Sequence, residues 1–576
     1  MAPRAKAAAT KATVAAKNAK PAPVPKAASK AAASKAAPKA APKAAPKAAP
    51  KAAPKTAPKT APKKAAANGA SNKRKAEEVP DEMDIDEPEE TRPVKKVKAA
   101  TEAPAKKAAS KAPVTKPESK RPKYTVGKKI NEAPTQTLNV FVFGEGSSGE
   151  LGLGSKRVDN KKPIDVKRPR LNHNLSPPKE EVVQLSCGGM HAIALTRDNK
   201  ILTWGVNDQG ALGRDTTWDG GLVDMDNAEG SDSEDDEDDS GINPLESTPG
   251  RVDDEYFAEG TRFVQVVASD SSSFVLTEDG RVYGWGTFRS SDGILGFTEK
   301  VKIQQTPMLI AGLKNIKALA TGSNHVLALE HSGNVVAWGC GQQNQLGRRI
   351  IERNKMSSLI PQGIRLPRGK IAKIACGSYH SFAIDKFGAV FGWGLNNFGE
   401  IGVETDAGQE NAVILHPVKI PNLEDLNVED IAGGEHHSVA CTSEGQLLTW
   451  GRVDGSQVGI DPNTMTEDNA IFDDRGKPRI LHVPTIVPDI SGVSSVSAGT
   501  DNSFAVTKEG KVYSWGFSSN YQTGQGTIDD VETPTVIDNT AIRDAHVVSS
   551  GAGGQFSILL AKAATSPGAN GVNGHA

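Results

Sequence analysis

Residues 316–347 read IKALATGSNHVLALEHSGNVVAWGCGQQNQLG, and this stretch is one complete copy of the unit from which most of the chain is built. Short runs of Val, Leu and Ala alternate with turns rich in Gly, Asn and Ser, a pattern that predicts short antiparallel strands. No helical period interrupts this pattern. Each unit therefore predicts a small four-stranded sheet.

An aromatic residue followed by Gly ends the strand-forming part of the unit and recurs seven times. Successive pairs lie 53 to 81 residues apart. A repeat of about this size predicts units that bury their apolar faces only against their neighbours, as propeller blades do. The pairs are Phe143-Gly144, Trp204-Gly205, Trp285-Gly286, Trp338-Gly339, Trp393-Gly394, Trp450-Gly451 and Trp515-Gly516.

The two ends of the repeat region each contain half a unit. Residues 138–154 hold only a second half, and residues 547–561 hold only a first half. Two such fragments predict one shared blade that closes a ring and protects the sheet edges. We therefore expect an all-β, seven-bladed β-propeller over residues 135–562, followed by a disordered C-terminal tail at residues 563–576.

The amino-terminal part differs sharply in composition from this region. Residues 1–130 contain 32 Lys and Arg against 11 Asp and Glu, and the first aromatic residue is Tyr124. A chain of Lys, Ala and Pro cannot bury enough apolar surface to fold, so residues 1–134 are predicted to be a long, disordered basic arm. The first 72 residues carry no acid, which favours salt-dependent binding to DNA. The alternative is a tail that only aids solubility.

Two basic clusters in the arm are candidate nuclear-import signals that import receptors would bind. They consist of Lys73, Arg74 and Lys75, and of Lys95, Lys96 and Lys98. Lysines interrupt every alanine run near the start, so neither a signal peptide nor a membrane span is predicted. The expected setting is intracellular, without a membrane partner.

Motifs for covalent chemistry and for metal binding are missing from the sequence. It has no phosphate-binding GxxxxGK[ST] loop, no GxSxG elbow and no HExxH. The four cysteines, Cys187, Cys340, Cys376 and Cys441, lie in different units without a Cys-x-x-Cys pair. We therefore expect no disulfide framework, no metal and no cofactor.

Histidines recur three residues after a glycine, at His191, His325, His380 and His437. Recurrence at one repeat position favours a structural role in binding turn carbonyls. Three polar residues near this position depart from the repeat, and they predict a binding face at one end of the ring. They are Asp270, Asn324 and His436. The alternative is that these positions are ordinary solvated turns.

Four strings carry a family resemblance: GVNDQGALGRDT from Gly205, GRVYGWGTFRSSDGILG from Gly280, GCGQQNQLGR from Gly339 and GGEHHSVAC from Gly433. They resemble the regulators of chromosome condensation, which are chromatin-bound guanine-nucleotide exchange factors for the small GTPase Ran. The resemblance covers residues 135–562 and implies a seven-bladed propeller. It also implies a nuclear, chromatin-associated protein that generates Ran-GTP for nucleocytoplasmic transport and mitosis, without covalent chemistry of its own.

The resemblance assigns roles to particular residues. It implies that Asp270, His436 and Asn324 act in exchange, although the family usually has Asp at the position of Asn324. It also implies a β-wedge that presses beside the nucleotide, formed by Thr287, Phe288, Arg289, Ser290, Ser291, Asp292, Gly293 and Ile294. A protruding wedge favours exchange over the alternative function, a chromatin-binding propeller scaffold without exchange activity.

A basic loop at the propeller edge resembles the family's contact with the acidic patch of the nucleosome. Its cations are Arg348, Arg349, Arg353, Lys355, Arg365 and Arg368. The expected partners are thus Ran, nucleosomal DNA through the arm, and histones through this loop.

Two further features lie outside the repeat. Residues 224–240 form an insertion that carries ten acidic residues, and no single role follows from it. Removal of Met1 would expose Ala2-Pro3-Arg4, which resembles the motif at which family members are methylated on the α-amine. Ala2 is therefore a predicted modification site.

Overall fold

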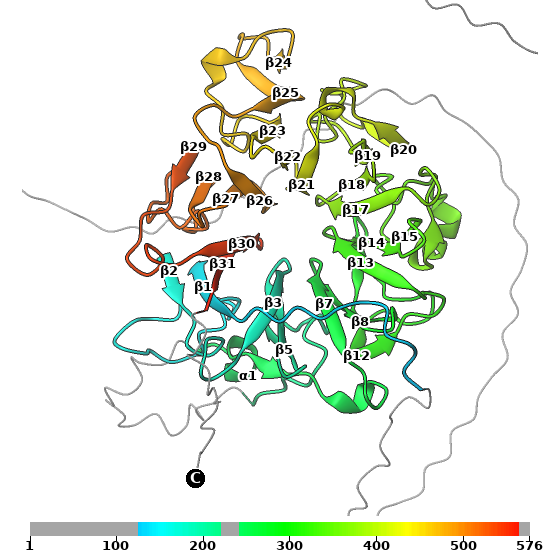
Figure 1. The fold of residues 1–576 in the computed structure, drawn as a ribbon, viewed down its shortest axis with the longest axis vertical. Helices are drawn as coiled ribbons and strands as arrows, with labels where there is room; N and C mark the ends of the chain where they lie inside the picture. Colours follow the sequence, from blue (N-terminus) through cyan, green and yellow to red (C-terminus); the bar gives the residue numbers. More distant parts are fainter. Residues whose placement is uncertain (1–124, 220–240, 564–576) are drawn as a thin grey trace, which may run out of the picture. The chain divides into compact units, whose positions relative to one another are not determined.

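The computed structural model describes residues 125–219 and 241–563. Most of the arm, both import clusters, Ala2, the acidic insertion and nearly all of the C-terminal tail lie outside these residues. Within them, seven antiparallel sheets are arranged around a central axis (Figure 1). The predicted all-β, seven-bladed propeller is confirmed.

Each blade contains four main strands, which we number as blades 1 to 7 in the order of the aromatic-Gly pairs. Blade 1 contains β30 (Val547–Ala552), β31 (Phe556–Lys562), β1 (Leu138–Gly144) and β2 (Val166–Leu171). Blade 2 contains β3 (Val182–Cys187), β4 (His191–Thr196), β5 (Ile201–Gly205) and β6 (Gly250–Arg251). Blade 3 contains β7 (Phe263–Ala268), β8 (Ser272–Thr277), β9 (Val282–Gly286) and β12 (Gln304–Leu309). Blade 4 contains β13 (Ile316–Thr321), β14 (His325–Glu330), β15 (Val335–Gly339) and β16 (Gln362–Gly363).

The remaining blades follow the same plan. Blade 5 contains β17 (Ile371–Cys376), β18 (His380–Asp385), β19 (Val390–Leu395) and β20 (Val413–Lys419). Blade 6 contains β21 (Val428–Gly433), β22 (His437–Thr442), β23 (Leu447–Arg452) and β25 (Pro478–Ile486), with β24 (Ala470–Phe472) added outside β25. Blade 7 contains β26 (Val493–Ala498), β27 (Asn502–Thr507), β28 (Val512–Gly516) and β29 (Val531–Val536).

The helices are short. Those among residues 125–219 and 241–563 are α1 (Pro244–Ser247) and the 3-10 helices η3 (Asp254–Tyr256), η4 (Glu352–Leu359), η5 (Pro421–Leu423) and η6 (Pro462–Thr464). No helix among the described residues has the length and apolar character needed to cross a membrane.

Blade 1 joins the two ends of the repeat region, as the split unit predicts. Strand β1 pairs antiparallel with β31 along its whole length, from Leu138 opposite Lys562 to Gly144 opposite Phe556. The continuous ladder leaves no open blade edge at the closure. The amino-terminal strand and the carboxy-terminal hairpin thus lock the ring.

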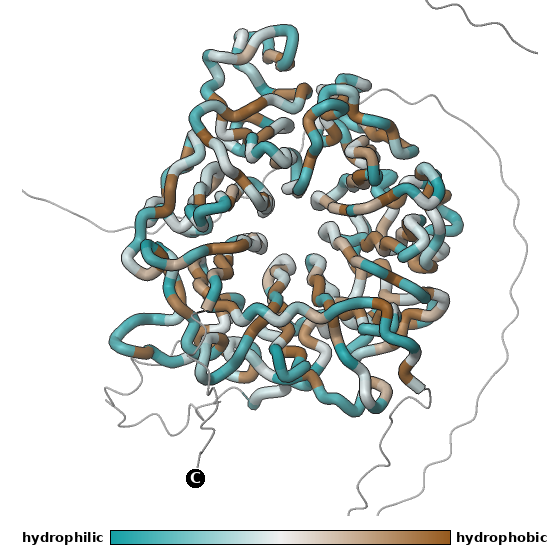
Figure 2. The backbone as a smooth tube through the Cα atoms, viewed as in Figure 1, coloured by the Kyte–Doolittle hydropathy of each residue, from teal (hydrophilic) through white to brown (hydrophobic). Residues whose placement is uncertain are grey.

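The aromatic-Gly pair holds neighbouring blades together. The Trp285 indole N–H donates to the backbone oxygen of Ala211 in the preceding blade at 2.7 Å. The six tryptophans that belong to these pairs are almost fully buried. Gly286 has a φ of +95°, and a Cβ there would lie 2.3 Å from the backbone oxygen of Ser271. Only glycine fits such a site. Hydrophobic stretches follow the strands, whereas the loops at the rim are largely hydrophilic (Figure 2).

The recurring histidines have the predicted structural role, but their partners are serines and not turn carbonyls. The Nε2 atom of His191 lies 2.9 Å from the hydroxyl of Ser273 in the next blade. That hydroxyl donates its hydrogen to the Ala211 carbonyl, so the Nε2 atom must be the donor to the serine. The same link joins His325, His380 and His437 to Ser381, Ser438 and Ser503.

These buried histidines predict a loss of stability in mild acid. Burial lowers the pKa of His191 from 6.5 to about 4. The unfolded chain therefore binds more protons in this window, and the contribution of His191 is complete above about pH 6.5 and lost as the pH falls towards 4. His191→Asn, which copies the residue that blade 7 has at this position, Asn502, should remove about 1.4 kcal/mol per pH unit from that slope. Urea unfolding of both chains at pH 6.5 and 4.5 measures it, and identical slopes would contradict the assignment.

Residues 125–134 correct the predicted boundary of the arm, because they pack against blades 3 and 4. Asn131 is 8% exposed, and its amide donates to the backbone oxygens of Thr277 at 3.2 Å and Ile316 at 2.8 Å. Its side-chain oxygen pairs with the His331 ring at 2.8 Å. Partners this distant in sequence explain why composition alone assigned the segment to the arm. We call residues 125–134 the strap (Figure 1).

Candidate functional site

The turns between the first and second strands of the blades form one face of the ring. In each blade the residue just before the second strand accepts a backbone hydrogen bond from the residue that follows the aromatic-Gly pair. This bond gives all seven turns the same backbone position, so the turns differ mainly in their side chains. We call the face the variable face, after its residues Met190, Ser271, Asn324, Tyr379, His436, Asp501 and Gln555.

The strap lies on the other side of the ring. It contacts Thr277, at the end of β8, whereas the variable face lies where β8 begins, next to Ser272. A β-strand carries its two ends to opposite sides of a blade. The first described residues of the chain therefore lie on the side of the ring opposite the variable face.

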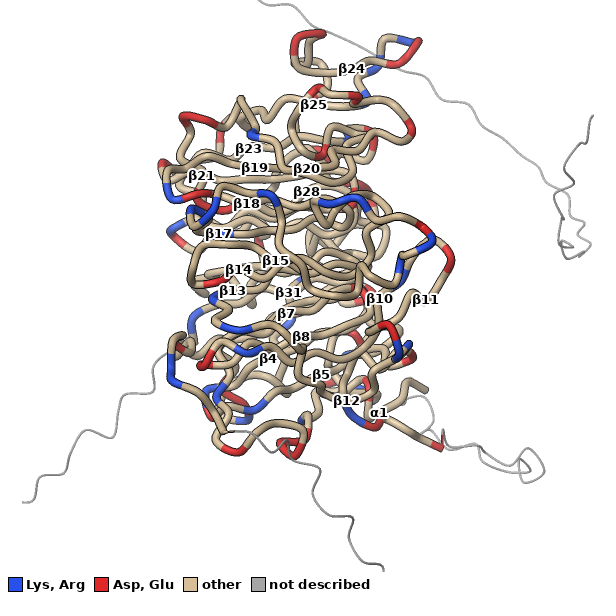
Figure 3. The backbone as a smooth tube through the Cα atoms, turned by 90° about the vertical axis from the view of Figure 1, so that its right-hand side faces the viewer, with Lys and Arg blue, Asp and Glu red and all other residues tan. Residues whose placement is uncertain are grey.

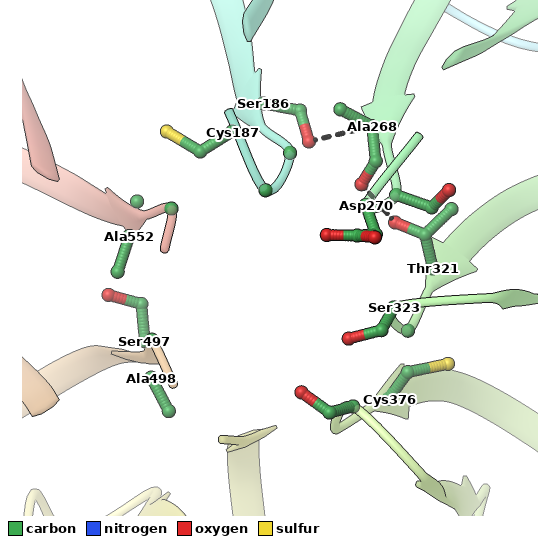
Figure 4. A pocket seen from close by; sticks show the side chains of 18 of the residues that line it. Ser186, Cys187, Ala268, Asp270, Thr321, Ser323, Cys376, Ser497, Ala498 and Ala552 are labelled. Atoms are coloured by element: carbon green, nitrogen blue, oxygen red, sulfur yellow. Dashed lines mark hydrogen bonds between the residues drawn. The ribbon is translucent and has the colours of Figure 1, made fainter. Parts of the chain in front are cut away.

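Asp270 lies at the rim of the central channel, one residue before the position of Asn324 and His436. The channel has a volume of about 330 Å³ and is lined by small residues of all the inner strands, including Ser186, Thr321 and Ser497 (Figure 4). Asp270 is the single Asp, Glu, Lys or Arg among the described residues that line it. Burial raises the pKa of its carboxyl group, while the charge of Arg289 opposes the rise. The carboxylate is thus a solitary negative charge in a polar opening.

Asn324 is connected to the same place through Arg289. The Asn324 side-chain oxygen accepts a hydrogen bond from the backbone N–H of Arg289 at 2.6 Å. Asp270, Arg289 and Asn324 therefore form one cluster across blades 3 and 4. The substitution of Asn for Asp keeps the acceptor oxygen that this contact uses. A direct contact of Asn324 with a GTPase stays a prediction.

The predicted wedge is a two-stranded ribbon after β9, formed by β10 (Phe288–Ser290) and β11 (Gly293–Gly296). It lies at one side of the ring in the side view of Figure 3. Ile294 is 41% exposed, and Arg289, Ser291 and Asp292 are also exposed. The solvent-facing part of the wedge is thus shorter than the sequence predicted.

Thr287 and Phe288 do not belong to this exposed part, and their assignment to a protruding wedge is corrected. Both are fully buried. The Phe288 ring stacks on Phe274 and Phe297 with centroids 6.0 and 6.1 Å away, and the Thr287 hydroxyl donates to a backbone oxygen in the β12 connection. An aromatic side chain gains more from such packing than from exposure. Phe288 therefore anchors the base of the wedge.

His436 lies apart from this cluster, in blade 6. Its Nδ1 atom is 3.0 Å from a carboxylate oxygen of Glu400, which has no exposed surface, and its ring lies 4.7 Å from the Phe398 ring. The Arg452 guanidinium is 5.2 Å from the centre of the Phe398 ring. His436 is therefore held in place by residues of the blade 5 loop.

Tyr379 occupies the variable-face position of blade 5, between Asn324 of blade 4 and His436 of blade 6. Burial raises the pKa of its phenol, and the negative charges of Glu435 and Asp270 raise it further. Both carboxylates are thus within electrostatic reach of one ring. From the sequence, none of Tyr379, Phe398, Glu400 and Arg452 was predicted to be a site residue.

The predicted basic loop is divided by the structure. The Arg348 guanidinium donates to the backbone oxygen of Ala337 at 3.0 Å, and burial lowers its pKa to about 10. Lys355 pairs with Asp292 and Glu352, each at 2.8 Å. These two are engaged within the chain, and their contact with chromatin stays a prediction. The exposed cations of the set are Arg349, Arg353, Arg365 and Arg368.

The four cysteines are free, and burial raises the pKa of the Cys187 thiol to about 12. Cys187 and Cys376 line the channel at one repeat position, where their siblings include Ala268 and Ala552. No cluster of His, Cys, Asp and Glu within the described part of the chain could hold a metal ion. The described residues thus offer charge and shape to a partner, and no assembled metal centre.

Comparison with known proteins agrees with this arrangement. The chain is 43% identical over 448 residues to Protein pim1 of Schizosaccharomyces pombe, which covers 77% of this chain and 78% of the relative. It is 42% identical to the guanine nucleotide exchange factor SRM1 of Saccharomyces cerevisiae, over 73% of this chain and 87% of the relative. Both relatives thus match through the greater part of their length.

A solved structure and a family model give the same result. The crystal structure of Prp20p from Saccharomyces cerevisiae, described with its binding to Gsp1p and histones, is 39% identical with a TM-score of 0.66. The match covers 74% of this chain and 92% of that chain. The model of the RCC1-like domain matches residues 139–559. This chain therefore belongs to the family of RCC1-like domain proteins.

Proposed function

We propose that the chain is a guanine-nucleotide exchange factor for the nuclear GTPase Ran. The observation that carries the proposal is the exposed ribbon, residues 289–294, standing next to the solitary carboxylate of Asp270. A relative that is 42% identical bears the name of a guanine nucleotide exchange factor. A scaffold needs no such ribbon fixed beside a charged opening.

The geometry supports exchange by differential binding. Asp270 offers a negative charge to a cation of the GTPase, and His436 offers a second polar contact across the face. The wedge would enter the space beside the nucleotide and displace the groups that hold it. A protein that binds nucleotide-free Ran more tightly than loaded Ran must weaken nucleotide binding by the same factor. The direction of exchange then follows the cellular excess of GTP.

Equilibrium binding tests this proposal. The Kd of the full chain is measured for nucleotide-free Ran and for GDP-loaded Ran, and the Kd of GDP is measured with and without the chain. We expect the two ratios to agree and to favour the nucleotide-free form. Equal affinity for both forms of Ran would instead support the second candidate function, a chromatin-binding scaffold without exchange activity.

The other side of the ring is proposed to face chromatin. The strap, which follows the arm in the sequence, lies on the side away from the variable face, and this leaves the variable face open to Ran when the arm binds DNA. Arg349, Arg353, Arg365 and Arg368 are exposed and offer a separate contact for acidic histone surfaces at the propeller edge, where Arg349 also lines the cavity beside the wedge. The basic clusters of the arm would bring the protein into the nucleus through import receptors. Two weak contacts on one particle cooperate through effective concentration.

Deletion of residues 1–124 should flatten the salt dependence of nucleosome binding. Each phosphate contact contributes about 0.9 to the slope of log K against log salt. The deleted segment holds 30 of the 69 Lys and Arg of the chain. The cut spares the strap, so exchange on Ran in solution serves as the control and should stay intact. Nucleosome binding is titrated between 50 and about 200 mM salt. A slope equal to that of the full chain would remove the arm from DNA binding.

A further inference from the structure

The wedge is anchored in the core only at its base. Phe288 and Leu295 are buried, whereas the tip, residues 289–294, extends beyond them. A cavity of about 340 Å³ borders the ribbon and is lined by Ser290 and Leu295 from the wedge and by Gln342 and other residues from blade 4. No close-packed surface therefore supports the tip on this side, and its position must depend on polar contacts.

Blade 4 supplies these polar contacts at three successive points. The first is the Asn324 oxygen on the Arg289 N–H. The second is bidentate: the Gln342 side-chain oxygen accepts from the Ser291 N–H at 2.9 Å, and its amide donates to the Ser291 hydroxyl at 2.8 Å. The third point is an ion pair.

This ion pair joins the wedge tip to helix η4. The Lys355 ammonium lies 2.8 Å from a carboxylate oxygen of Asp292 and 2.8 Å from one of Glu352 on its own helix. Glu352 keeps the ammonium aligned, which lowers the entropy cost of the contact with Asp292. The wedge leaves blade 3 but is thus fixed to blade 4.

We propose that Gln342 and Lys355 are positioning residues that hold the wedge in its productive orientation for nucleotide release. This proposal rests on the proposed exchange function. A small misplacement of a group beside the reacting centre lowers a rate strongly without preventing binding. Gln342 and Lys355 therefore raise the maximal release rate, whereas the affinity for the GTPase depends on other residues of the variable face.

The test for Gln342 uses the full chain and Ran loaded with a fluorescent GDP. Gln342→Met keeps the volume and removes both hydrogen bonds, whereas Gln342→Glu keeps two acceptor oxygens for the N–H and the hydroxyl of Ser291. We expect Gln342→Met to lower the maximal release rate about fivefold, roughly 1 kcal/mol. The chain concentration at half-saturation should change less than twofold, and Gln342→Glu should recover most of the rate.

Gln343→Met is the matched control on the same turn, because the Gln343 side chain makes no hydrogen bond with the described residues. It should release nucleotide at the rate of the unaltered chain. Equal rates for Gln342→Met and Gln343→Met would overturn the assignment, and so would a loss confined to the half-saturating concentration. If the unaltered chain itself does not accelerate release, the proposed exchange function is contradicted, and not the positioning role alone.

A charge exchange tests Lys355 without depending on one variant that could fold poorly. Lys355→Asp should slow release, and Asp292→Lys should slow it as well. The double variant restores an ion pair of reversed polarity and should recover release to within about twofold of the unaltered rate, the pattern of a double-mutant cycle. Additive losses in the double variant would overturn a positioning contact between the two residues.

Discussion

Asp270→Ala should slow Ran nucleotide release at least tenfold, which corresponds to roughly 1.4 kcal/mol. Asp270 is the single Asp, Glu, Lys or Arg among the described residues that line the channel, and burial raises the pKa of its carboxyl group. A cation of the GTPase that docks there would pair with the Asp270 carboxylate. The attraction would be strong because the site is poorly solvated. Removal of the Asp270 carboxylate therefore lowers the affinity for nucleotide-free Ran more than it lowers the folding stability of the chain.

Thr500→Ala is the matched control, because Thr500 lines the same channel at the equivalent position of blade 7. It should leave release unchanged. Thermal unfolding of Asp270→Ala should occur at a temperature no lower than that of the unaltered chain, since burial disfavours the charged carboxylate. Release at the unaltered rate would remove Asp270 from the site.

Replacement of residues 289–294 by a short Gly-Ser turn should have the largest effect, a fall in the maximal release rate of about a hundredfold, roughly 2.7 kcal/mol. The replacement spares Thr287 and Phe288, because both are buried and their loss would disturb the core. The exposed wedge is small compared with the whole variable face. Ran binding should therefore weaken by less than about tenfold, or 1.4 kcal/mol.

Two measurements on one preparation separate these effects. Stopped-flow release gives the maximal rate, and equilibrium binding to nucleotide-free Ran gives the affinity. Circular dichroism confirms that the propeller is intact. If rate and affinity fall by the same factor, the wedge contributes to docking alone, and its proposed role in release is wrong.

The ring itself was predictable because its determinants are local and repeated. Each aromatic-Gly pair has a direct physical reason, since the tryptophan donates to the preceding blade and the glycine takes a backbone conformation closed to other residues. The half units at the two ends identified the shared blade, and β1 pairs with β31 as this requires. Seven copies of one pattern allow the fold to be predicted, whereas a single copy would not.

The site was predictable only in part, because its remaining contacts join residues far apart in sequence. Nothing near His436 in the sequence indicates the buried Glu400 that holds its ring. Charge alone could not distinguish Arg348, whose guanidinium donates hydrogen bonds to backbone oxygens, from the exposed Arg349. The strap was missed for the same reason. The sequence around Asn131 does not show that its amide bonds the backbone oxygens of Thr277 and Ile316, which are far away along the chain.

The most direct measurement is stopped-flow release of a fluorescent GDP from Ran, with excess unlabelled GTP, at increasing concentrations of the full chain. If the chain is an exchange factor, the release rate should rise steeply with its concentration and then saturate. Release should be far slower with Asp270→Ala and unchanged with Thr500→Ala. A release rate equal to that of Ran alone, from a chain that still binds Ran and nucleosomes, would contradict exchange and leave a chromatin-binding scaffold.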